Sequence, residues 1–275
     1  MKQIEINGRQ LAYRKGGDGE TIIALHCSSS HSGQWKPLIS ALEQNARVIA
    51  PDMHGYGRSE SFVVDGRPWF EHDAEYVLTL IEQSDRPVHL VGHSLGAALA
   101  CFVTRSRPEA VASLTMIEPV LFALLEEAEA PEVKDAWWIS STLHGLLRVG
   151  RQEEAAETFV DFWAGSGSWD ATEDHVKAYV IQTIGRVADD WAGMAQLLEG
   201  QVRLADIASL KMPVLMMRGT ETRASASRIV DLMLERLPDG RLVEFSGLGH
   251  MAAVTHPDIV MPEIIGWLDG HLKQS

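Results

Sequence analysis

The feature that most constrains this chain is a strand, a tight turn and a helix joined at residues 92–96. The apolar run Val88–Val91 predicts a buried strand, and the alanine- and leucine-rich segment from Ala97 to Val103 predicts a helix. The turn reads Gly-His-Ser-Leu-Gly, the G-x-S-x-G pattern of a nucleophile elbow. Glycine is needed on both sides of the serine because side chains there would collide with the crossing strand and helix.

This turn predicts a chemical role for Ser94. The strained backbone lifts Ser94 Oγ above the carboxyl edge of the sheet, where it is available as a nucleophile. The amide of Leu95 lies in the first turn of the helix and points at the space beside Ser94. We therefore expect Leu95 to donate one hydrogen bond to an oxyanion formed there.

Composition and charge exclude several classes of protein. With 275 residues, 45% of them hydrophobic, the chain can form one large α/β domain with an inserted subdomain. Its formal net charge of -14 repels phosphate backbones and anionic membranes. We therefore expect a small-molecule substrate as the partner, and neither nucleic acid nor a membrane. The sequence leaves a homodimer open.

Cysteine usage and the N-terminal residues favour a reducing compartment. Cys27 and Cys101 form no C-x-x-C motif and no disulfide framework. The segment Met1–Gly8 lacks the apolar stretch of a signal peptide, so we expect a cytoplasmic protein. No H-E-x-x-H motif or close histidine spacing is present, and we expect neither a metal nor a cofactor.

Apolar patterning along the chain alternates strands with helices. Period-two alternation predicts a hairpin over Lys2–Arg14, and apolar runs predict six further strands at residues 21–25, 47–50, 88–91, 111–117, 214–217 and 241–245. Helical spacing is found at residues 35–42, 69–83, 97–103, 225–237 and 259–272. This order indicates a mostly parallel, eight-stranded sheet with helices on both faces.

A helical block interrupts this alternation between residues 120 and 210. It has no convincing strand pattern and carries five of the eight tryptophans, namely Trp137, Trp138, Trp163, Trp169 and Trp191. Because the block is inserted between two strands, we expect it to form a lid over the carboxyl edge, where ligands bind in such sheets. We divide the chain into a core of residues 1–119 and 211–275 and a helical cap of residues 120–210. Trp138 and Trp163 are expected to contact the substrate.

A serine nucleophile needs a base, and the base needs an acid that orients it. After an elbow, the chain order of these groups is serine, acid, histidine. Of the 11 histidines, His250 follows the last predicted strand, inside a loop whose glycines let its ring reach the elbow. His250 is therefore the expected base.

The motifs together resemble those of the α/β-hydrolase-fold family, and the resemblance spans nearly the whole chain. It is carried by four segments, which are residues 26–28 (His-Cys-Ser), 52–59 (Asp-Met-His-Gly-Tyr-Gly-Arg-Ser), 92–96 and 249–251 (Gly-His-Met). The resemblance implies the α/β-hydrolase fold with an inserted lid. It also implies that segment 52–59 shapes the rim of the site.

The segment after the third strand carries a second implied donor. In the family, the amide two residues after the equivalent of His26 joins the oxyanion hole, which makes Ser28 the partner of Leu95. Cys27 stands where family members usually have glycine, a departure that tightens this loop. We also expect His26 to contact the substrate.

The acid is where this sequence departs most from the family. The usual acid lies three residues after the glycine that ends the penultimate strand, and that position is Thr222, which carries no charge. Glu221, one residue earlier, and Glu118, at the end of the strand after the elbow helix, are both candidates. We favour Glu118, because certain lipases and dehalogenases of this fold place the acid at that strand end. Its alternative role is to cap the first helix of the lid.

The sequence thus predicts a serine hydrolase in which Ser94, His250 and Glu118 form the catalytic triad. The substrate is expected to be a small, largely apolar ester, or a thioester, lactone or activated carbon–carbon bond. The alternative is a binding protein on the same fold that turns over very slowly, which a missing acid at Thr222 would suit.

Overall fold

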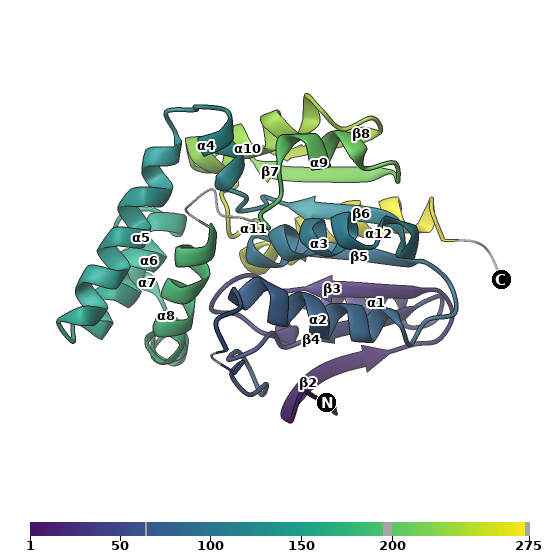
Figure 1. Cartoon of the computed structure of the whole chain (residues 1–275), viewed down its shortest axis with the longest axis horizontal. Coiled ribbons are helices and arrows are strands. Elements are labelled where there is room, and N and C mark those ends of the chain that lie inside the picture. Colours follow the sequence, from purple (N-terminus) through teal and green to yellow (C-terminus); the bar gives the residue numbers. More distant parts are fainter. Residues whose placement is uncertain (64, 195–199, 273–275) are drawn as a thin grey trace.

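The computed structural model describes residues 1–63, 65–194 and 200–272. In this part of the chain, eight strands form one sheet in the order β1-β2-β4-β3-β5-β6-β7-β8 (Figure 1). The strands are β1 (Lys2–Ile6), β2 (Arg9–Gly16), β3 (Thr21–Leu25), β4 (Arg47–Pro51), β5 (Val88–His93), β6 (Val111–Ile117), β7 (Val214–Gly219) and β8 (Gly240–Phe245). The β1–β2 and β2–β4 pairs are antiparallel and the others are parallel, which confirms the predicted fold class.

Helices cover both faces of the sheet, as the alternating pattern predicts. One apolar cluster joins a sheet face to α2 (Trp69–Ile81), α3 (Leu95–Ser106) and α10 (Ala224–Leu234). The cluster on the other face includes η1 (Ser32–Trp35), α1 (Lys36–Leu42), α11 (Ala252–Thr255) and α12 (Pro257–Asp269). A short η2 (Pro108–Ala110) leads into β6. The closing helix begins at Pro257, two residues earlier than the apolar spacing predicts, because proline is preorganised for the first helical position.

The helical insertion lies between β6 and β7. It contains α4 (Ala123–Glu127), α5 (Val133–Arg148), α6 (Gln152–Ala164), α7 (Ser168–Ala171), α8 (Asp174–Met194) and α9 (Leu204–Ser209). Helices α5, α6 and α8 pack on one another beside one end of the sheet (Figure 1). The short helices α4 and α9 instead contact α10, and Arg105 of α3 donates to the carbonyl of Gln201 at 2.9 Å. The two ends of the insertion therefore rest on the core.

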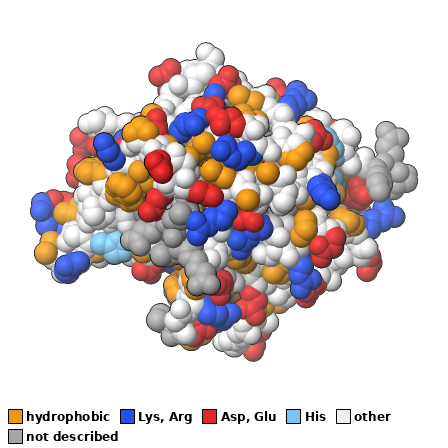
Figure 2. Space-filling view, turned by 45° about the horizontal axis from the view of Figure 1, so that its top comes forward, with side chains coloured by type: hydrophobic (Ala, Val, Ile, Leu, Met, Phe, Trp, Pro, Cys, Tyr) orange, Lys and Arg blue, Asp and Glu red, His pale blue; other side chains and the backbone are white. Residues whose placement is uncertain are grey.

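Charge on the surface is mixed. On the face shown in Figure 2, acidic and basic side chains are interspersed, so the net negative charge is spread over that face. Among the described helices, none combines the length and the apolar character needed to cross a membrane.

The turn between β5 and α3 has the strained backbone that its glycines predict. Ser94 adopts φ 57° and ψ -114°, in a region that side chains rarely occupy. A Cβ added to Gly92 would lie 2.4 Å from the Gly96 carbonyl oxygen, and one added to Gly96 would lie 2.3 Å from the Leu25 carbonyl oxygen of β3. Both distances are far below van der Waals contact, so the elbow exists only with glycine at these positions.

Gly96→Ala should therefore destabilise the protein. We expect the free energy of unfolding to fall by about 1–3 kcal/mol, the usual effect of overpacking a dense interior. Urea titration followed by tryptophan fluorescence measures this change. The matched control is Gly145→Ala in α5, where an added Cβ meets no described atom within 4 Å. That variant should gain up to about 1 kcal/mol from helix propensity, and a loss equal to that of Gly96→Ala would contradict the elbow argument.

Candidate active site

Three side chains from distant parts of the sequence form a hydrogen-bonded chain at the carboxyl ends of the strands. Ser94 begins the elbow helix, Glu118 follows β6, and His250 lies in the loop after β8. His250 Nε2 is 2.9 Å from Ser94 Oγ, and His250 Nδ1 is 2.7 Å from Glu118 Oε2. A carboxylate only accepts, so Nδ1 carries the proton and Nε2 accepts from the Ser94 hydroxyl. All three side chains are buried.

Glu118 is held in place by more than the histidine. Its Oε1 accepts from the Gly219 amide at 2.8 Å, and its Oε2 also accepts from the Thr222 hydroxyl. Burial opposes the charged form, but the hydrogen bonds from His250, Thr222 and Gly219 outweigh it and hold the pKa of Glu118 below its ordinary value. The structure therefore brings Glu118, and not the exposed Glu221, to the imidazole.

The backbone at Glu118 is unusual for a glutamate. Its φ of 44° lies in the left-handed region that favours glycine. The Glu118 amide donates to the Met217 carbonyl of β7 at 3.0 Å, which holds this conformation. This turn directs the carboxylate back over the sheet edge towards His250.

Trp163 and His93 support the histidine from two sides. The Trp163 indole of α6 stacks on the His250 ring, with centroids 3.6 Å apart and planes 18° from parallel. His93 donates through Nε2 to the His250 carbonyl at 2.9 Å, so its Nδ1 accepts from Gln34 Nε2 at 3.0 Å. Burial lowers the pKa of His93 to about 3, which keeps the ring neutral in this role. This role of His93 was not predicted from the sequence, although the position of the residue inside the elbow was a usable signal.

The expected oxyanion donors lie beside the nucleophile. Leu95 is the first residue of α3, and Ser28 lines the same cavity as Ser94. We call residues 26–30 the oxyanion loop, because it carries Ser28. Within it, Cys27 is buried, and burial raises the pKa of its thiol to about 12, so the side chain is a neutral thiol. That the Ser28 and Leu95 amides bind an oxyanion stays a prediction.

Ser94 and His250 open onto a cavity of about 650 Å³. The core contributes the oxyanion loop and the segment after His250, and the cap contributes α6 and α8. Its cap wall is largely apolar and includes Phe159, Val160, Trp163, Val176 and Val180. The arrangement can hold an apolar group next to an activated hydroxyl.

The structure places two of the expected substrate contacts outside the cavity lining. His26 is fully buried, with Nδ1 donating to the Cys27 carbonyl at 2.7 Å and Nε2 accepting from the Met53 amide at 3.0 Å. It braces the oxyanion loop against segment 52–59 and does not line the cavity. Trp138 also lies outside the cavity lining, 53% exposed on α5 and stacked on Phe162. Its neighbours in the sequence do not reveal which face of α5 points inward.

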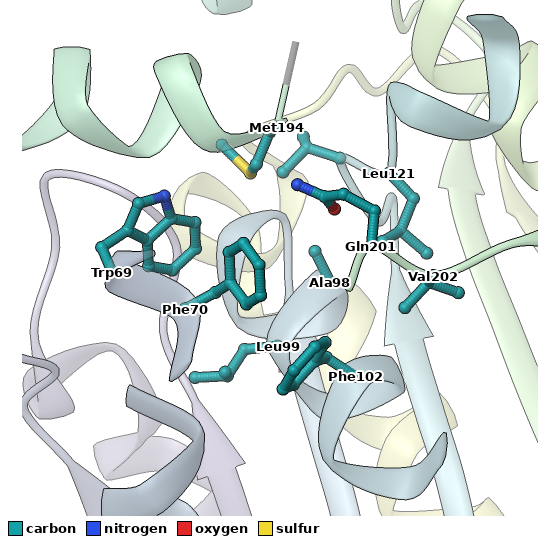
Figure 3. Close-up of a pocket in the computed structure, with 10 residues that line it drawn as sticks. Trp69, Phe70, Ala98, Leu99, Phe102, Leu121, Met194, Gln201 and Val202 are labelled. Atoms are coloured by element: carbon teal, nitrogen blue, oxygen red, sulfur yellow. The ribbon is translucent and has the colours of Figure 1, made fainter. Parts of the chain in front are cut away.

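A second hollow, of about 20 Å³, lies among α2, α3 and the segment around Gln201 (Figure 3). It is walled by apolar side chains such as Trp69, Phe70 and Met194, and it has room for about one water molecule. No titratable side chain lines it among the described residues, so it offers no chemistry. Within those residues, no group of three or more His, Cys, Asp or Glu side chains is placed to hold a metal ion.

Comparison with known proteins places the chain in a family. A model described as the Alpha/beta hydrolase family matches residues 22–263, and the protein belongs to that family. The chain is 22% identical over 271 residues to the (E)-2-((N-methylformamido)methylene)succinate hydrolase of Acinetobacter baylyi, covering 96% of this chain and 95% of that protein. It is 23% identical over 247 residues to the pimeloyl-(acyl-carrier protein) methyl ester esterase of Nitrosomonas europaea, covering 88% and 93%.

The fold of the family is equally clear among solved structures. An alpha/beta hydrolase from a Medee basin deep-sea metagenome library superposes with a TM-score of 0.81 at 16% identity, covering 100% of this chain and 99% of the other. The family and its relatives identify this protein as a hydrolase.

The lowered pKa of Glu118 predicts a pH dependence of stability. Because the ordinary value is 4.5, ionised Glu118 stabilises the fold above pH 4.5, and the contribution is lost as the pH falls through the lowered pKa. We expect the loss in free energy of unfolding caused by Glu118→Gln to be largest near pH 7 and to shrink towards about pH 3. Urea titrations at both pH values measure it, with Glu221→Gln as the exposed control. A Glu118→Gln loss that is the same at both pH values would contradict the assignment.

Proposed function

We propose that this protein is a serine hydrolase that cleaves a small, largely apolar carboxylic ester through an acyl-enzyme. The observation that carries the proposal is the chain of hydrogen bonds from Ser94 through His250 to Glu118, opening onto an apolar cavity. The name of the Nitrosomonas europaea relative, a methyl ester esterase, supports an ester as the substrate. Thioesters, lactones and activated carbon–carbon bonds would react through the same tetrahedral chemistry.

In the proposed reaction, His250 Nε2 takes the Ser94 proton as Ser94 Oγ attacks the carbonyl carbon. The carbonyl oxygen becomes an oxyanion, which the amides of Ser28 and Leu95 stabilise. Glu118 holds the proton on Nδ1 and stabilises the imidazolium. Collapse of this intermediate breaks the ester bond, and the leaving alcohol takes the proton from Nε2. Water then repeats the sequence on the acyl-enzyme, releasing the acid and restoring Ser94.

The cap wall of the cavity favours apolar acyl groups over cationic ones. That wall is largely apolar, and none of the described residues that line the cavity is Asp or Glu. A cationic substrate would therefore find no ion pair there, although the protein as a whole has a formal net charge of -14. An apolar acyl chain, by contrast, gains from leaving water.

The proposal is tested by substituting the acid and its near neighbour. Glu118→Gln should lower kcat on 4-nitrophenyl butyrate by about 10³–10⁴-fold, because an amide favours the wrong tautomer and gives the imidazolium no counter-charge. Glu221→Gln is the matched control and should stay within about twofold of wild type, the ordinary scatter of a surface change. Ser94→Ala should abolish both turnover and labelling by a fluorophosphonate. Wild-type protein that neither labels nor turns over would favour the slow binding-protein alternative.

The cap wall should set the preferred acyl length. Val180 of α8 lines the cavity and is buried, so Val180→Ala should extend the pocket and move the optimum of a 4-nitrophenyl ester series to a longer chain. Deleting two methyl groups from such a wall changes selectivity by about 10-fold or less per ester. Trp138→Ala, outside the cavity, should keep the wild-type optimum. An optimum that moves only in Trp138→Ala would contradict the assigned wall.

A further inference from the structure

One polar face of the cap helix α8 lies against the oxyanion loop. Tyr179, Thr183, Arg186 and Asp190 follow one another at helical spacing, so their side chains lie on one side of α8. The other buried residues of α8 are mostly apolar, so these four polar side chains are expected to have specific partners. Each of the four binds a group of the core, across 113 or more residues of sequence.

Thr183 contacts the loop at its most unusual residue. Ser29 Oγ lies 2.7 Å from Thr183 Oγ1. Thr183 donates its own proton to the Tyr179 carbonyl at 2.9 Å, so the Ser29 hydroxyl is the donor between them. Ser29 has φ 53°, in the left-handed region that serine seldom adopts. The hydrogen bond to Thr183 therefore holds the residue directly after the expected oxyanion donor in a strained conformation.

Tyr179 and Asp190 hold the loop on either side of that contact. The Tyr179 hydroxyl donates to the Ser30 carbonyl at 2.9 Å and accepts from the Gly57 amide at 2.9 Å. Asp190 accepts from Tyr56 at 2.5 Å, and Ser28 Oγ lies 3.4 Å from the same carboxylate oxygen. Three successive serines thus each face one residue of α8.

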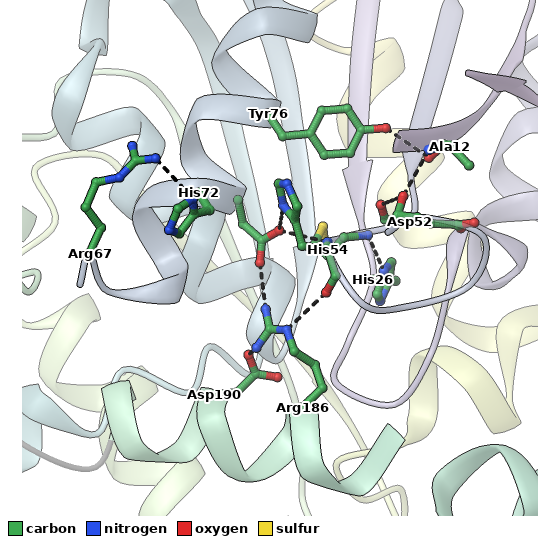
Figure 4. Close-up of polar contacts among 12 residues, drawn as sticks. Ala12, His26, Asp52, His54, Arg67, His72, Tyr76, Arg186 and Asp190 are labelled. Atoms are coloured by element: carbon green, nitrogen blue, oxygen red, sulfur yellow. Dashed lines mark hydrogen bonds and ion pairs between the residues drawn. The ribbon is translucent and has the colours of Figure 1, made fainter. Parts of the chain in front are cut away.

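Arg186 anchors this face of α8 to the core. Its guanidinium bridges Asp190 of α8 and Asp73 of α2, the latter at 2.9 Å, and donates through Nε to the His54 carbonyl at 3.0 Å (Figure 4). Burial disfavours its charge, but Asp190 and Asp73 outweigh burial and raise the pKa of Arg186 above its ordinary value. A charged group buried between two carboxylates is expensive to separate. Arg186 therefore fixes α8 to α2 and to segment 52–59 of the core.

We propose that α8 of the cap is a positioning element for the oxyanion hole, with Thr183 setting the conformation of Ser29 and thereby the direction of the Ser28 amide. This inference rests on the proposed function. It makes the cap part of the catalytic geometry as well as a wall for the substrate. Oxyanion contacts act in the transition state and not in substrate binding, so their loss lowers kcat and leaves KM unchanged.

The test uses Thr183→Val, which keeps the shape of the side chain and removes the acceptor. We expect kcat on 4-nitrophenyl butyrate to fall about tenfold, less than when an oxyanion donor itself is deleted, with KM within about twofold. The inhibition constant of hexyl trifluoromethyl ketone, whose adduct with Ser94 carries an oxyanion, should rise by the same factor. Thr183→Ser retains a hydroxyl and should restore most of the wild-type kcat.

The matched control is Thr158→Val in α6. Thr158 makes the same bond to its own helix, donating to the Glu154 carbonyl at 2.7 Å, and does not line the cavity. Its kcat and ketone affinity should equal those of wild type. Ser29→Ala removes the same hydrogen bond from the side of the loop. The kcat of the Ser29→Ala/Thr183→Val double variant should therefore be close to that of either single variant, since all three lack the same interaction.

Two results would overturn this inference. One is a Thr183→Val variant whose kcat equals that of Thr158→Val. The other is a fall in kcat without a matching weakening of the trifluoromethyl ketone, which would place the effect away from the oxyanion. Neither result touches the proposed function, because that proposal is tested on the wild-type protein and on the Ser94 and Glu118 variants, and not on Thr183.

Discussion

The close approach of Gly96 to the Leu25 carbonyl is the contact on which the rest of the site depends. It allows α3 to begin directly against the end of β3, and the left-handed backbone of Ser94 follows from the same crossing. Because the oxyanion loop leaves β3 at this point, the contact also brings Ser28 to the nucleophile. The absence of a side chain at Gly96 therefore sets the distance between Ser94 and the loop expected to stabilise the oxyanion of the tetrahedral intermediate.

The carboxylate that binds His250 is surrounded by residues from the ends of two neighbouring strands. Glu118 follows β6, Thr222 follows β7, and the two strands are adjacent in the sheet. Thr222 donates to Glu118, so the residue at the family's usual acid position still belongs to the acid's surroundings. The geometry requires a left-handed glutamate backbone, which the hydrogen bonds to β7 hold in place.

Sequence patterns predicted the features that depend on local spacing. The eight strands, the elbow and the helical insertion follow from periodicity and glycine placement, and those patterns are visible within a few residues. The direction in which a single side chain points cannot be predicted from such local patterns. Trp163 stacks on His250 while Trp138 is half exposed, and both are tryptophans on cap helices. Only the packing of α5 and α6 against the core distinguishes them.

The buried network on α8 also had no local signal. Arg186 and Asp73 are 113 residues apart, and Tyr56 and Asp190 are 134 residues apart. A charged pair at that separation looks like two ordinary surface residues until the cap folds onto the core. The position of His26 had no local signal either, because both ring nitrogens are hydrogen-bonded to backbone groups, one in its own loop and one in segment 52–59.

The most direct test of the central claim is whether an acyl group becomes attached to Ser94 during turnover. Wild-type protein mixed with excess 4-nitrophenyl butyrate and quenched in acid within milliseconds should show an intact mass increased by one butyryl group. Peptide mapping should place that group on Ser94, and Ser94→Ala should show no added mass. Turnover of the ester without any acylated protein, or an acyl group on another residue, would contradict the account.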